Sequence, residues 1–161
     1  MDVEIIQLTK SDIQYFPTIC KWFYHWWGKE EGFTMEKLNA YVSNSLCQER
    51  LPQTHALLLN GEIIGVYQLS LNDIDVRPDI YPWLINVYID YPHRGKGYFE
   101  KLMLSVKENC RKLGIKQIYL YTTHNGMYER FGWQFEEEFN TFIEGKEIQR
   151  LYSRNFSETI L

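Results

Sequence analysis

The sequence predicts a single α/β domain, in which strand-type and helix-type segments alternate along the chain. Residues 83–89 are apolar, β-branched and aromatic, which is typical of a buried strand. After a basic glycine turn, apolar residues recur at steps of three and four from Phe99 to Leu113, as on one face of a helix, and Gly114 follows as a stop residue. The chain has 161 residues and no evident repeat or linker, so we expect one domain over residues 1–161.

The first half of the chain is predicted to place two helices between strands. Residues 3–8 alternate as in a strand. A helix follows and should end near Gly28, with an inward face formed by Ile13, Phe16, Ile19, Cys20 and Phe23. Thr34 is placed to cap the second helix. The Asn60-Gly61 pair, between the apolar segments 56–59 and 63–69, is a strong hairpin signal.

The second half continues the alternation. A polar loop over residues 72–82 precedes the central strand, and residues 115–122 form the strand after the central helix. A short helix then ends at Gly132. Residues 136–142 and 147–152 are predicted to close the domain as a hairpin around residues 144–146.

Composition excludes several function classes. The net charge of −4, without a long basic run, argues against a nucleic-acid surface. The sequence shows no signal peptide and no apolar run of about 18 residues, so we expect a cytoplasmic protein without membrane contact. Three cysteines without a Cys-x-x-Cys pair predict reduced thiols, and the histidines lack metal-ligand spacing, so no metal is expected.

The basic glycine turn between the central strand and helix is typical of an anion-binding site. Arg94 and Lys96 bring positive charge to a helix N-terminus, whose N–H groups and dipole favour an anion. Gly95 and Gly97 allow close backbone approach. The spacing fits no Walker loop, and Glu100 stands where a dinucleotide fingerprint needs glycine. A basic turn that merely caps the helix stays open as the alternative.

Two motifs resemble those of the GCN5-related N-acetyltransferases. The first is Arg-x-x-Gly-x-Gly/Ala, read from Arg94, with Phe99 at the position where the family has Gly or Ala. The second is the run 125–133, which is similar to the family's Asn followed by Tyr-Glu-Lys-x-Gly-Phe, with Arg130 for Lys and Trp133 for Phe. The resemblance covers nearly the whole chain. It implies a mixed, mostly antiparallel central sheet flanked by helices, in the order β-α-α-β-β-β-α-β-α-β-β.

The resemblance implies acetyl-CoA as co-substrate and assigns residues to it. In the family a bulge in the fourth strand frees backbone N–H groups, which hold the pantetheine arm and polarise the thioester carbonyl; here these belong to Val87, Tyr88 and Ile89. The pyrophosphate is expected on the N–H groups of residues 94–99. The implied cofactor-binding residues are therefore Val87, Tyr88, Ile89, Arg94, Gly95, Lys96, Gly97, Tyr98, Phe99 and Asn125.

Two residues are expected to carry proton transfer. Tyr128 matches the family's tyrosine, and a phenol with a pKa near ~10 is protonated at neutral pH and can supply a proton to the departing thiolate. His124 has a suitable ordinary pKa for a general base. Asp73, Asn86, Glu30 and a relayed water compete for the role of base. Core packing of Tyr128 and a solvated His124 stay open as structural alternatives.

The acceptor is expected to be a small, cationic primary amine that attacks the thioester directly. The residues expected to bind it are Trp26, Trp27, Glu30, Asp73 and Asn86. Core packing is the alternative role for the aromatic run 22–27. The alternative function is a non-catalytic acyl-CoA sensor, favoured by Phe99 and by the short loop before Tyr128. The identity of the amine stays open, as does a homodimer.

Overall fold

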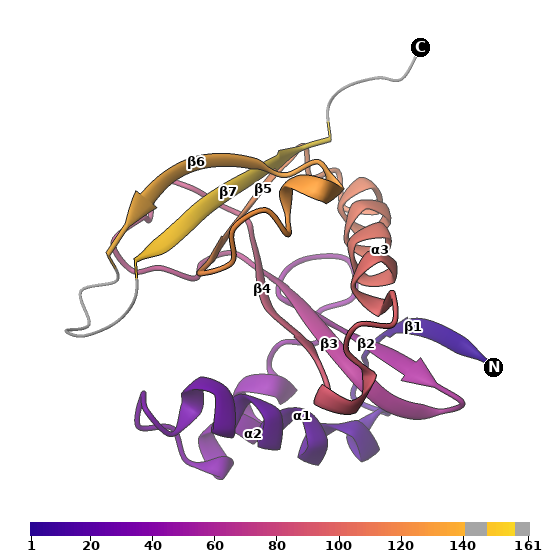
Figure 1. Ribbon diagram of the computed structural model, residues 1–161. Helices are drawn as coiled ribbons and strands as arrows, with labels where there is room; N and C mark the ends of the chain where they lie inside the picture. The colour runs from indigo at the N-terminus through magenta and orange to yellow at the C-terminus, as the bar shows by residue number, and fades with distance from the viewer. Residues whose placement is uncertain (141–147, 157–161) are drawn as a thin grey trace. The chain divides into compact units, whose positions relative to one another are not determined.

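The computed structural model describes residues 1–140 and 148–156, which form two compact units (Figure 1). The first unit consists of Met1–Leu69 with Asn86–Leu102, and the second of Ser70–Ile85 with the chain from Met103 onward. The strand β4 and the helix α3 each continue from one unit into the other. A single domain over residues 1–161 stays a prediction.

The order of elements follows the predicted one. The strands are β1 (Val3–Gln7), β2 (Gln53–Leu59), β3 (Glu62–Ser70), β4 (Trp83–Ile89), β5 (Gln117–Thr122), β6 (Gln134–Phe139) and β7 (Gln149–Asn155). The helical elements are η1 (Ile13–Tyr15), α1 (Phe16–Phe23), η2 (Tyr24–Gly28), α2 (Met35–Ser43), η3 (Tyr91–His93), α3 (Tyr98–Lys112) and η4 (Glu129–Phe131). The strands form a seven-stranded sheet in the order β1-β2-β3-β4-β5-β7-β6. β4 pairs in parallel with β5, while β1/β2, β2/β3, β5/β7 and β6/β7 are antiparallel, so the predicted mixed, mostly antiparallel sheet is confirmed.

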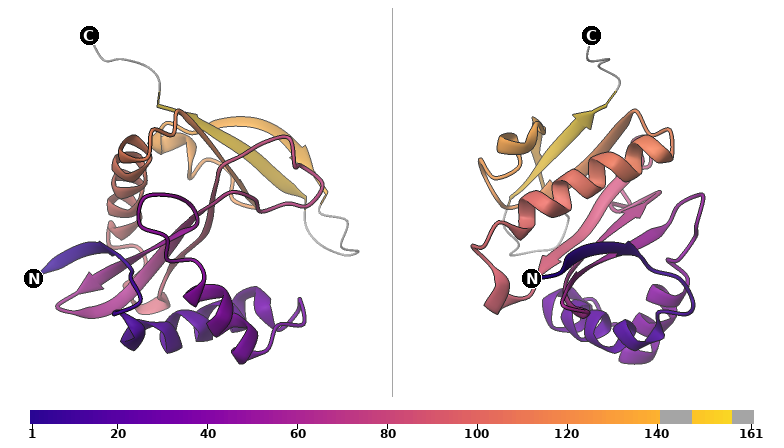
Figure 2. Two further views of the ribbon diagram at one scale, coloured as in Figure 1. Left: turned by 180° about the vertical axis from the view of Figure 1, so that it is seen from behind. Right: turned by 90° about the vertical axis from the view of Figure 1, so that its right-hand side faces the viewer.

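In the first unit, α1 and α2 lie together on one face of β1–β3 (Figures 1 and 2). The inward positions Phe16, Ile19, Cys20 and Phe23 are buried, as predicted. Ile13 is 65% exposed, so its predicted inward position is wrong. The physical reason is that Ile13 belongs to the separate 3₁₀ turn η1, whose three-residue period does not continue the phase of α1.

Two local sequence signals produce the turns that they predict. The Asn60-Gly61 pair joins β2 to β3 with both residues at positive φ, 51° and 82°, as a type I′ turn requires. The Asn60 side chain also accepts a hydrogen bond from the N–H of Asp2 at 2.9 Å, which ties the start of β1 to the hairpin. Thr34 caps α2 by accepting from the N–H of Lys37 at 3.1 Å.

The helix α3 buries its predicted stripe with one shift at its start. Leu102, Met103, Val106 and Cys110 are buried. Phe99, expected as the first core residue, is only half-buried, and its neighbour Tyr98 is buried instead. One residue along a helix is a rotation of about 100° (3.6 residues per turn), so only one of two adjacent aromatic rings can point inward at this end.

In the second unit, β5, β7 and β6 form antiparallel neighbours, and a core of Ile74, Trp83, Ile85 and Leu151 lies among them. The predicted closing hairpin is present as β6 and β7, each displaced by a few residues from its expected bounds. Its expected turn at residues 144–146 lies outside the described residues. The short helix before β6 is the 3₁₀ turn η4, and Gly132 ends it at φ 87° as predicted.

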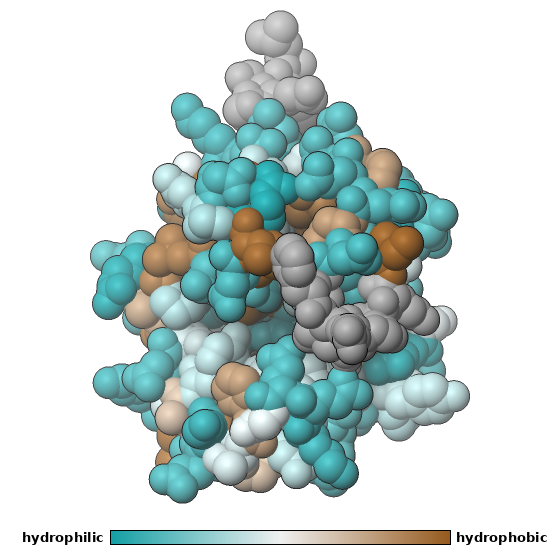
Figure 3. Space-filling view, turned by 90° about the vertical axis from the view of Figure 1, so that its left-hand side faces the viewer, coloured by the Kyte–Doolittle hydropathy of each residue, from teal (hydrophilic) through white to brown (hydrophobic). Residues whose placement is uncertain are grey.

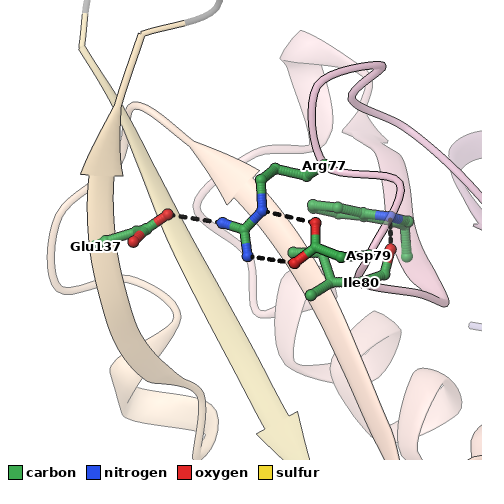
Figure 4. A network of polar contacts seen from close by, with 5 residues as sticks. Arg77, Asp79, Ile80 and Glu137 are labelled. Carbon is green, nitrogen blue, oxygen red and sulfur yellow. Dashed lines mark hydrogen bonds and ion pairs between the residues drawn. The ribbon is translucent and has the colours of Figure 1, made fainter.

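The long loop between β3 and β4 is fastened by Arg77 (Figure 4). Its guanidinium makes a bidentate pair with Asp79, at 2.9 and 3.0 Å, and reaches Glu137 of β6 at 2.7 Å. The guanidinium also lowers the pKa of the Asp79 carboxyl through this hydrogen bond. Because the three side chains are partly or fully exposed, these ion pairs contribute little to stability. Their main effect is to orient the loop.

No helix within residues 1–140 and 148–156 is both long and apolar enough to span a membrane. On the face drawn in Figure 3, where the grey atoms leave it visible, hydrophobic residues form small separate patches in a mostly hydrophilic surface. The three cysteines are free thiols, and two of them, Cys20 and Cys110, are buried.

The burial of Cys110 predicts a loss of stability at alkaline pH. Burial raises the pKa of this thiol from 9.0 to about 12, so the folded state holds a proton that the unfolded state releases above pH 9. This contribution is complete below pH 9 and is lost as the pH rises towards 12. We expect the loss of this contribution to lower the free energy of unfolding by on the order of 1 kcal/mol between pH 7.5 and 10.

Urea denaturation of the parent and of Cys110→Ala at these two pH values measures this contribution. The loss of stability should be smaller by that amount in Cys110→Ala. Cys47→Ala, which removes a half-buried thiol, serves as the matched control and should keep the parent's pH dependence. An equal loss in all three proteins would contradict the prediction.

Candidate functional site

The basic glycine turn lies between the end of β4 and the start of α3, within the first unit. Asp90 closes the preceding turn η3: its side chain accepts from the N–H of Tyr91 at 3.0 Å, and its carbonyl accepts from the N–H of His93 at 2.9 Å. Gly95 and Gly97 adopt φ of 73° and 84°, a region that favours glycine. Residues 94–97 are all exposed, so the turn presents its backbone to solvent.

The available backbone donors of the turn begin at Gly95. The N–H of Arg94 donates to the carbonyl of Tyr91 at 3.2 Å and is therefore already engaged. Among the hydrogen bonds of the described residues, the amides of Gly95, Lys96 and Gly97 have no protein acceptor. They precede the first turn of α3, whose N–H groups also lack intrahelical acceptors. Together with the exposed Lys96, these amides have the donor geometry and charge that anion-binding turns use, so the turn is a candidate site for an anion.

The side chain of Arg94 joins the turn to β4. Its Nε donates to the carbonyl of Ile89 at 2.7 Å, and its guanidinium lies 5.2 Å from the ring centre of Tyr88 and 5.7 Å from that of Tyr91. Planar stacking on aromatic rings and a fixed donor direction are properties of guanidinium that lysine lacks. Arg94 therefore fixes the direction in which the chain leaves β4.

The aromatic run after α1 forms the π-helical turn η2, and its two tryptophans differ. Trp26 is 47% exposed, and its ring centre lies 5.6 Å from that of Tyr88 on β4. Trp27 is half-buried and packs edge-on against Phe33 and Tyr41. These contacts favour the core-packing role for Trp27 and leave Trp26 as the tryptophan with an available face. Single π-turns occur frequently at functional sites.

Asn86 interrupts β4 with a left-handed residue. Its φ is 51°, although it lies inside the strand, and such a departure from extended backbone is the local geometry of a bulge. The side-chain amide donates to Oε1 of Gln68 at 2.7 Å and to the hydroxyl of Tyr41 at 3.2 Å. Asn86 immediately precedes the segment 87–89, to which the pantetheine arm was assigned.

In the second unit, Tyr128 lies in an aromatic environment. It is 6% exposed, and its ring packs edge-on against Trp133 at 5.9 Å and at a tilt of 38° against Tyr152 at 6.0 Å. Burial raises the pKa of Tyr128 well above that of an ordinary phenol, so its hydroxyl remains protonated across the neutral range. After it, Gly132 adopts a φ of 87°, which favours glycine, and an added Cβ would lie 2.6 Å from the guanidinium carbon of Arg154, so that this side chain would have to move.

The loop before Tyr128 exposes both His124 and Asn125. The N–H of His124 donates to the Thr122 hydroxyl at 3.1 Å, and its carbonyl accepts a long hydrogen bond from Tyr152 at 3.5 Å. The Glu129 carboxylate accepts from the N–H of Gly126 at 3.1 Å. The pKa of the Glu129 carboxyl is lowered, and the largest cause is the hydrogen bond from Tyr152. These contacts hold the loop on β7, and the imidazole of His124 points to no partner among the described residues.

The predicted site residues fall into two groups, one in each unit. The glycine turn, residues 86–89, Trp26, Trp27 and Glu30 belong to the first unit, where Tyr88 contacts both Trp26 and Arg94. The second unit holds Asp73, His124, Asn125 and Tyr128. Glu30 is exposed and Asp73 is half-buried.

Sequence reasoning did not identify the partners of Asn86. Gln68 is 1% exposed inside β3, and Tyr41 lies on α2, 45 residues before Asn86 in the sequence. A signal was present in the sequence, since Gln53, Thr54 and Gln68 are polar residues inside otherwise apolar strands. Buried polar groups require hydrogen-bond partners, so these positions indicate a buried polar network.

Comparison with known proteins gives the family. The model of the acetyltransferase (GNAT) family matches residues 16–133, which include both motifs. The chain belongs to this family. The GNAT match begins at the first residue of α1 and ends at Trp133, directly before β6.

Solved structures share the fold of this GNAT chain over nearly its whole length. An aminoglycoside 6'-N-acetyltransferase complexed with coenzyme A is 10% identical, with a TM-score of 0.76 and coverage of 98% of this chain and 99% of that one. An acetyltransferase from Bacillus anthracis in complex with acetyl coenzyme A is 16% identical, with a TM-score of 0.70 and coverage of 98% and 100%. An N-acetyltransferase from Staphylococcus aureus Mu50 is 12% identical, with a TM-score of 0.73 and coverage of 96% and 99%.

The contacts of Arg94 predict a measurable contribution to stability. Arg94→Ala removes one hydrogen bond and two ring contacts, and we expect it to lower the free energy of unfolding by about 1 kcal/mol. Arg94→Lys should recover less than half of this loss, because an ammonium lacks the planar face. Chemical denaturation gives the comparison. Lys96→Ala is the control and should change stability by less than about 0.5 kcal/mol, since Lys96 is exposed. Equal values for Arg94→Ala and Lys96→Ala would show that the Arg94 contacts contribute no stability.

Proposed function

We propose that this protein is an N-acetyltransferase that moves the acetyl group from acetyl-CoA to a primary amine of a small, cationic acceptor by direct attack. The observation that carries the proposal is the exposed glycine turn at the start of α3, where three successive backbone amides and the side chain of Lys96 have no acceptor among the described residues. This is the donor set that a pyrophosphate needs. The complexes of two structurally similar proteins with acetyl coenzyme A and coenzyme A support the choice of ligand.

The assignment of the donor follows the chain from β4 into α3. Residues 87–89 hold the pantetheine arm through their backbone and polarise the thioester carbonyl, which stabilises the oxyanion of the transition state. The amides from Gly95 to Phe99 bind the pyrophosphate, and Asn125 contacts the pantetheine arm. Arg94 contributes charge and fixes the turn through Ile89 and the ring of Tyr88.

The chemical step needs one proton donor and one proton acceptor. The nitrogen of the neutral amine forms a bond to the thioester carbon, the carbon–sulfur bond breaks, and the thiolate leaves with the electron pair. Tyr128 is assigned as the acid that protonates this thiolate, and its raised pKa keeps the phenol protonated before the step. The ammonium proton of the attacking amine passes to His124 or to water.

The acceptor is assigned from charge and aromatic surface. The chain carries a net charge of −4, and Trp26 presents an exposed ring near Tyr88. An aromatic face attracts a cation, and Glu30 adds a carboxylate in the same unit. The name of the aminoglycoside 6'-N-acetyltransferase, one of the structurally similar proteins, also refers to an amine-bearing acceptor.

A non-catalytic acyl-CoA sensor is the second candidate, and Phe99 favours it. This residue is half-buried at the position where the family's loop motif has Gly or Ala, so the loop carries a bulky side chain at its end. A sensor and an enzyme both bind acetyl-CoA, but only the enzyme releases free CoA thiol when an amine is added.

The first test measures binding and turnover by the same protein. Titration calorimetry with acetyl-CoA should show saturable binding, and a thiol-release assay over a panel of aminoglycosides, polyamines and amino-acid amines should identify at least one acceptor. Binding without thiol release on any amine would support the sensor. Absence of binding would overturn both candidates.

Gly97→Ala, which places a side chain at φ 84°, should weaken binding of acetyl-CoA at least tenfold.

The role of Tyr128 predicts a specific effect on turnover. Tyr128→Phe should lower kcat by about 100-fold, in the range measured for loss of a general acid, with the Kd for acetyl-CoA changed less than twofold. Because burial raises the pKa of Tyr128, kcat of the parent should not fall at pH 10, where an ordinary phenol is half ionised. Tyr81→Phe, a change at an exposed tyrosine of the second unit, is the matched control. A kcat for Tyr128→Phe equal to that of the control would remove Tyr128 from the mechanism.

A further inference from the structure

A chain of hydrogen bonds runs through the first unit and ends at Asn86. The Asn86 amide donates to Gln68 at 2.7 Å and to the hydroxyl of Tyr41 at 3.2 Å, and that hydroxyl donates to Oε1 of Gln68 at 3.1 Å. Nε2 of Gln68 donates to the hydroxyl of Thr54 at 3.0 Å, which donates to the carbonyl of Ser45 at 2.8 Å. The polar relay, as we name these five residues, links α2 and the residues after it to β2, β3 and β4.

The donor and acceptor of every hydrogen bond in the polar relay follow from the Ser45 carbonyl, at the end of the relay opposite Asn86. The carbonyl of Ser45 can only accept, so the proton of the Thr54 hydroxyl points to it. The Thr54 oxygen must then accept from the Gln68 amide, which turns Oε1 of Gln68 towards Tyr41 and Asn86. Two donors therefore face this oxygen, and the NH₂ group of Asn86 is directed inward. Its carbonyl oxygen, Oδ1, is left outside the relay.

The buried part of the polar relay cannot easily adopt another arrangement. Thr54 is 0% and Gln68 is 1% exposed, and a buried polar group that loses its partner is costly. Asn86 itself is half-buried, so its Oδ1 lies at the edge of the relay. No hydrogen bond to this oxygen occurs among the described residues.

The polar relay also controls the backbone of β4. Asn86 holds φ at 51°, a region that asparagine enters more readily than most residues because its side chain can form hydrogen bonds there. The two hydrogen bonds from its amide fasten this left-handed residue to β3 and α2. The segment 87–89, which follows directly, takes its direction from this residue.

The polar relay reaches the aromatic segment as well. The ring of Tyr41 packs edge-on against Trp27, with 6.0 Å between ring centres, and Trp27 lies in the same π-helical turn as Trp26. Tyr41 therefore touches the segment assigned to the acceptor through its ring and the left-handed residue of β4 through its hydroxyl.

We propose that Oδ1 of Asn86 accepts a hydrogen bond from the acceptor's amine, and that Tyr41 and Gln68 are positioning residues that hold this oxygen in place. This inference rests on the proposed function. An amide oxygen takes up no proton near neutral pH, so Asn86 is not the general base. By accepting one N–H of the amine it orients the nitrogen lone pair for attack.

Two variants separate this role from a structural one. Asn86→Gly keeps the positive φ accessible and removes the whole side chain, which includes Oδ1 and the amide that donates to Gln68 and Tyr41. Tyr41→Phe keeps the ring contacts and removes only the hydroxyl. We expect kcat/KM for the amine to fall about tenfold in Asn86→Gly, because the hydrogen bond to the amine is lost. In Tyr41→Phe we expect a fall of about threefold, because Asn86 loses one of the two side chains that position it. The Kd for acetyl-CoA should change less than twofold in both.

Tyr15→Phe is the matched control, because the Tyr15 hydroxyl donates to the carbonyl of Gly61 at 3.3 Å, outside the relay. It should keep the parent's kcat/KM. A lower Tm in Asn86→Gly and Tyr41→Phe, with kcat/KM equal to that of the control, would overturn the inference and leave the relay a structural feature. A parent protein that binds no acetyl-CoA and releases no thiol would overturn the proposed function, and this inference with it; the parent alone shows that outcome.

Discussion

The first unit depends on the hydrogen bonds between Gln68, Tyr41 and Asn86, because they join three elements, β3, α2 and β4, through side chains that lie far apart in the sequence. Gln68 lies 27 residues from Tyr41 and 18 from Asn86, yet all three side chains share one set of donors and acceptors. Apolar contacts among α1, α2 and the strands tolerate small displacements, since they have no direction. Hydrogen bonds of fixed polarity do not, and they therefore set the position of α2 and the interruption of β4 together.

From that interruption, β4 leads to Tyr88 and the glycine turn. The ring of Tyr88 is contacted by Trp22 at 5.0 Å, by Trp26 at 5.6 Å and by the guanidinium of Arg94 at 5.2 Å. One side chain of β4 thus touches both the aromatic segment and the residue that fixes the turn. Side chains on both sides hold the glycine turn in place, while the amides of Gly95, Lys96 and Gly97 have no acceptor within residues 1–140 and 148–156.

Sequence patterns predicted the features that depend on neighbouring residues and missed those that depend on distant ones. The bounds of β4, the Asn60-Gly61 turn and the Thr34 cap follow from local chemistry. The family resemblance implied a bulge in β4, but local patterns did not identify Asn86 as its left-handed residue, because Ile85-Asn86-Val87 has the pattern of a continuous strand until Gln68 and Tyr41 are placed beside it. Phe99 was misplaced because Tyr98 and Phe99 suit the core equally well, and only the start of α3 decides between them.

In the proposed function, the glycine turn acts through its backbone, whereas the aromatic segment acts through its side chains. Structures that are only 10–16% identical to this chain reach TM-scores of 0.70–0.76, so the backbone arrangement persists while most side chains change. A turn that binds an anion through backbone amides depends on chain conformation, which such divergence preserves. An acceptor is recognised by side chains, and sequence divergence of this extent does not preserve most of them. For this chain, the proposed function therefore assigns the choice of acceptor to side chains such as Trp26 and Asn86, because the fold by itself does not determine it.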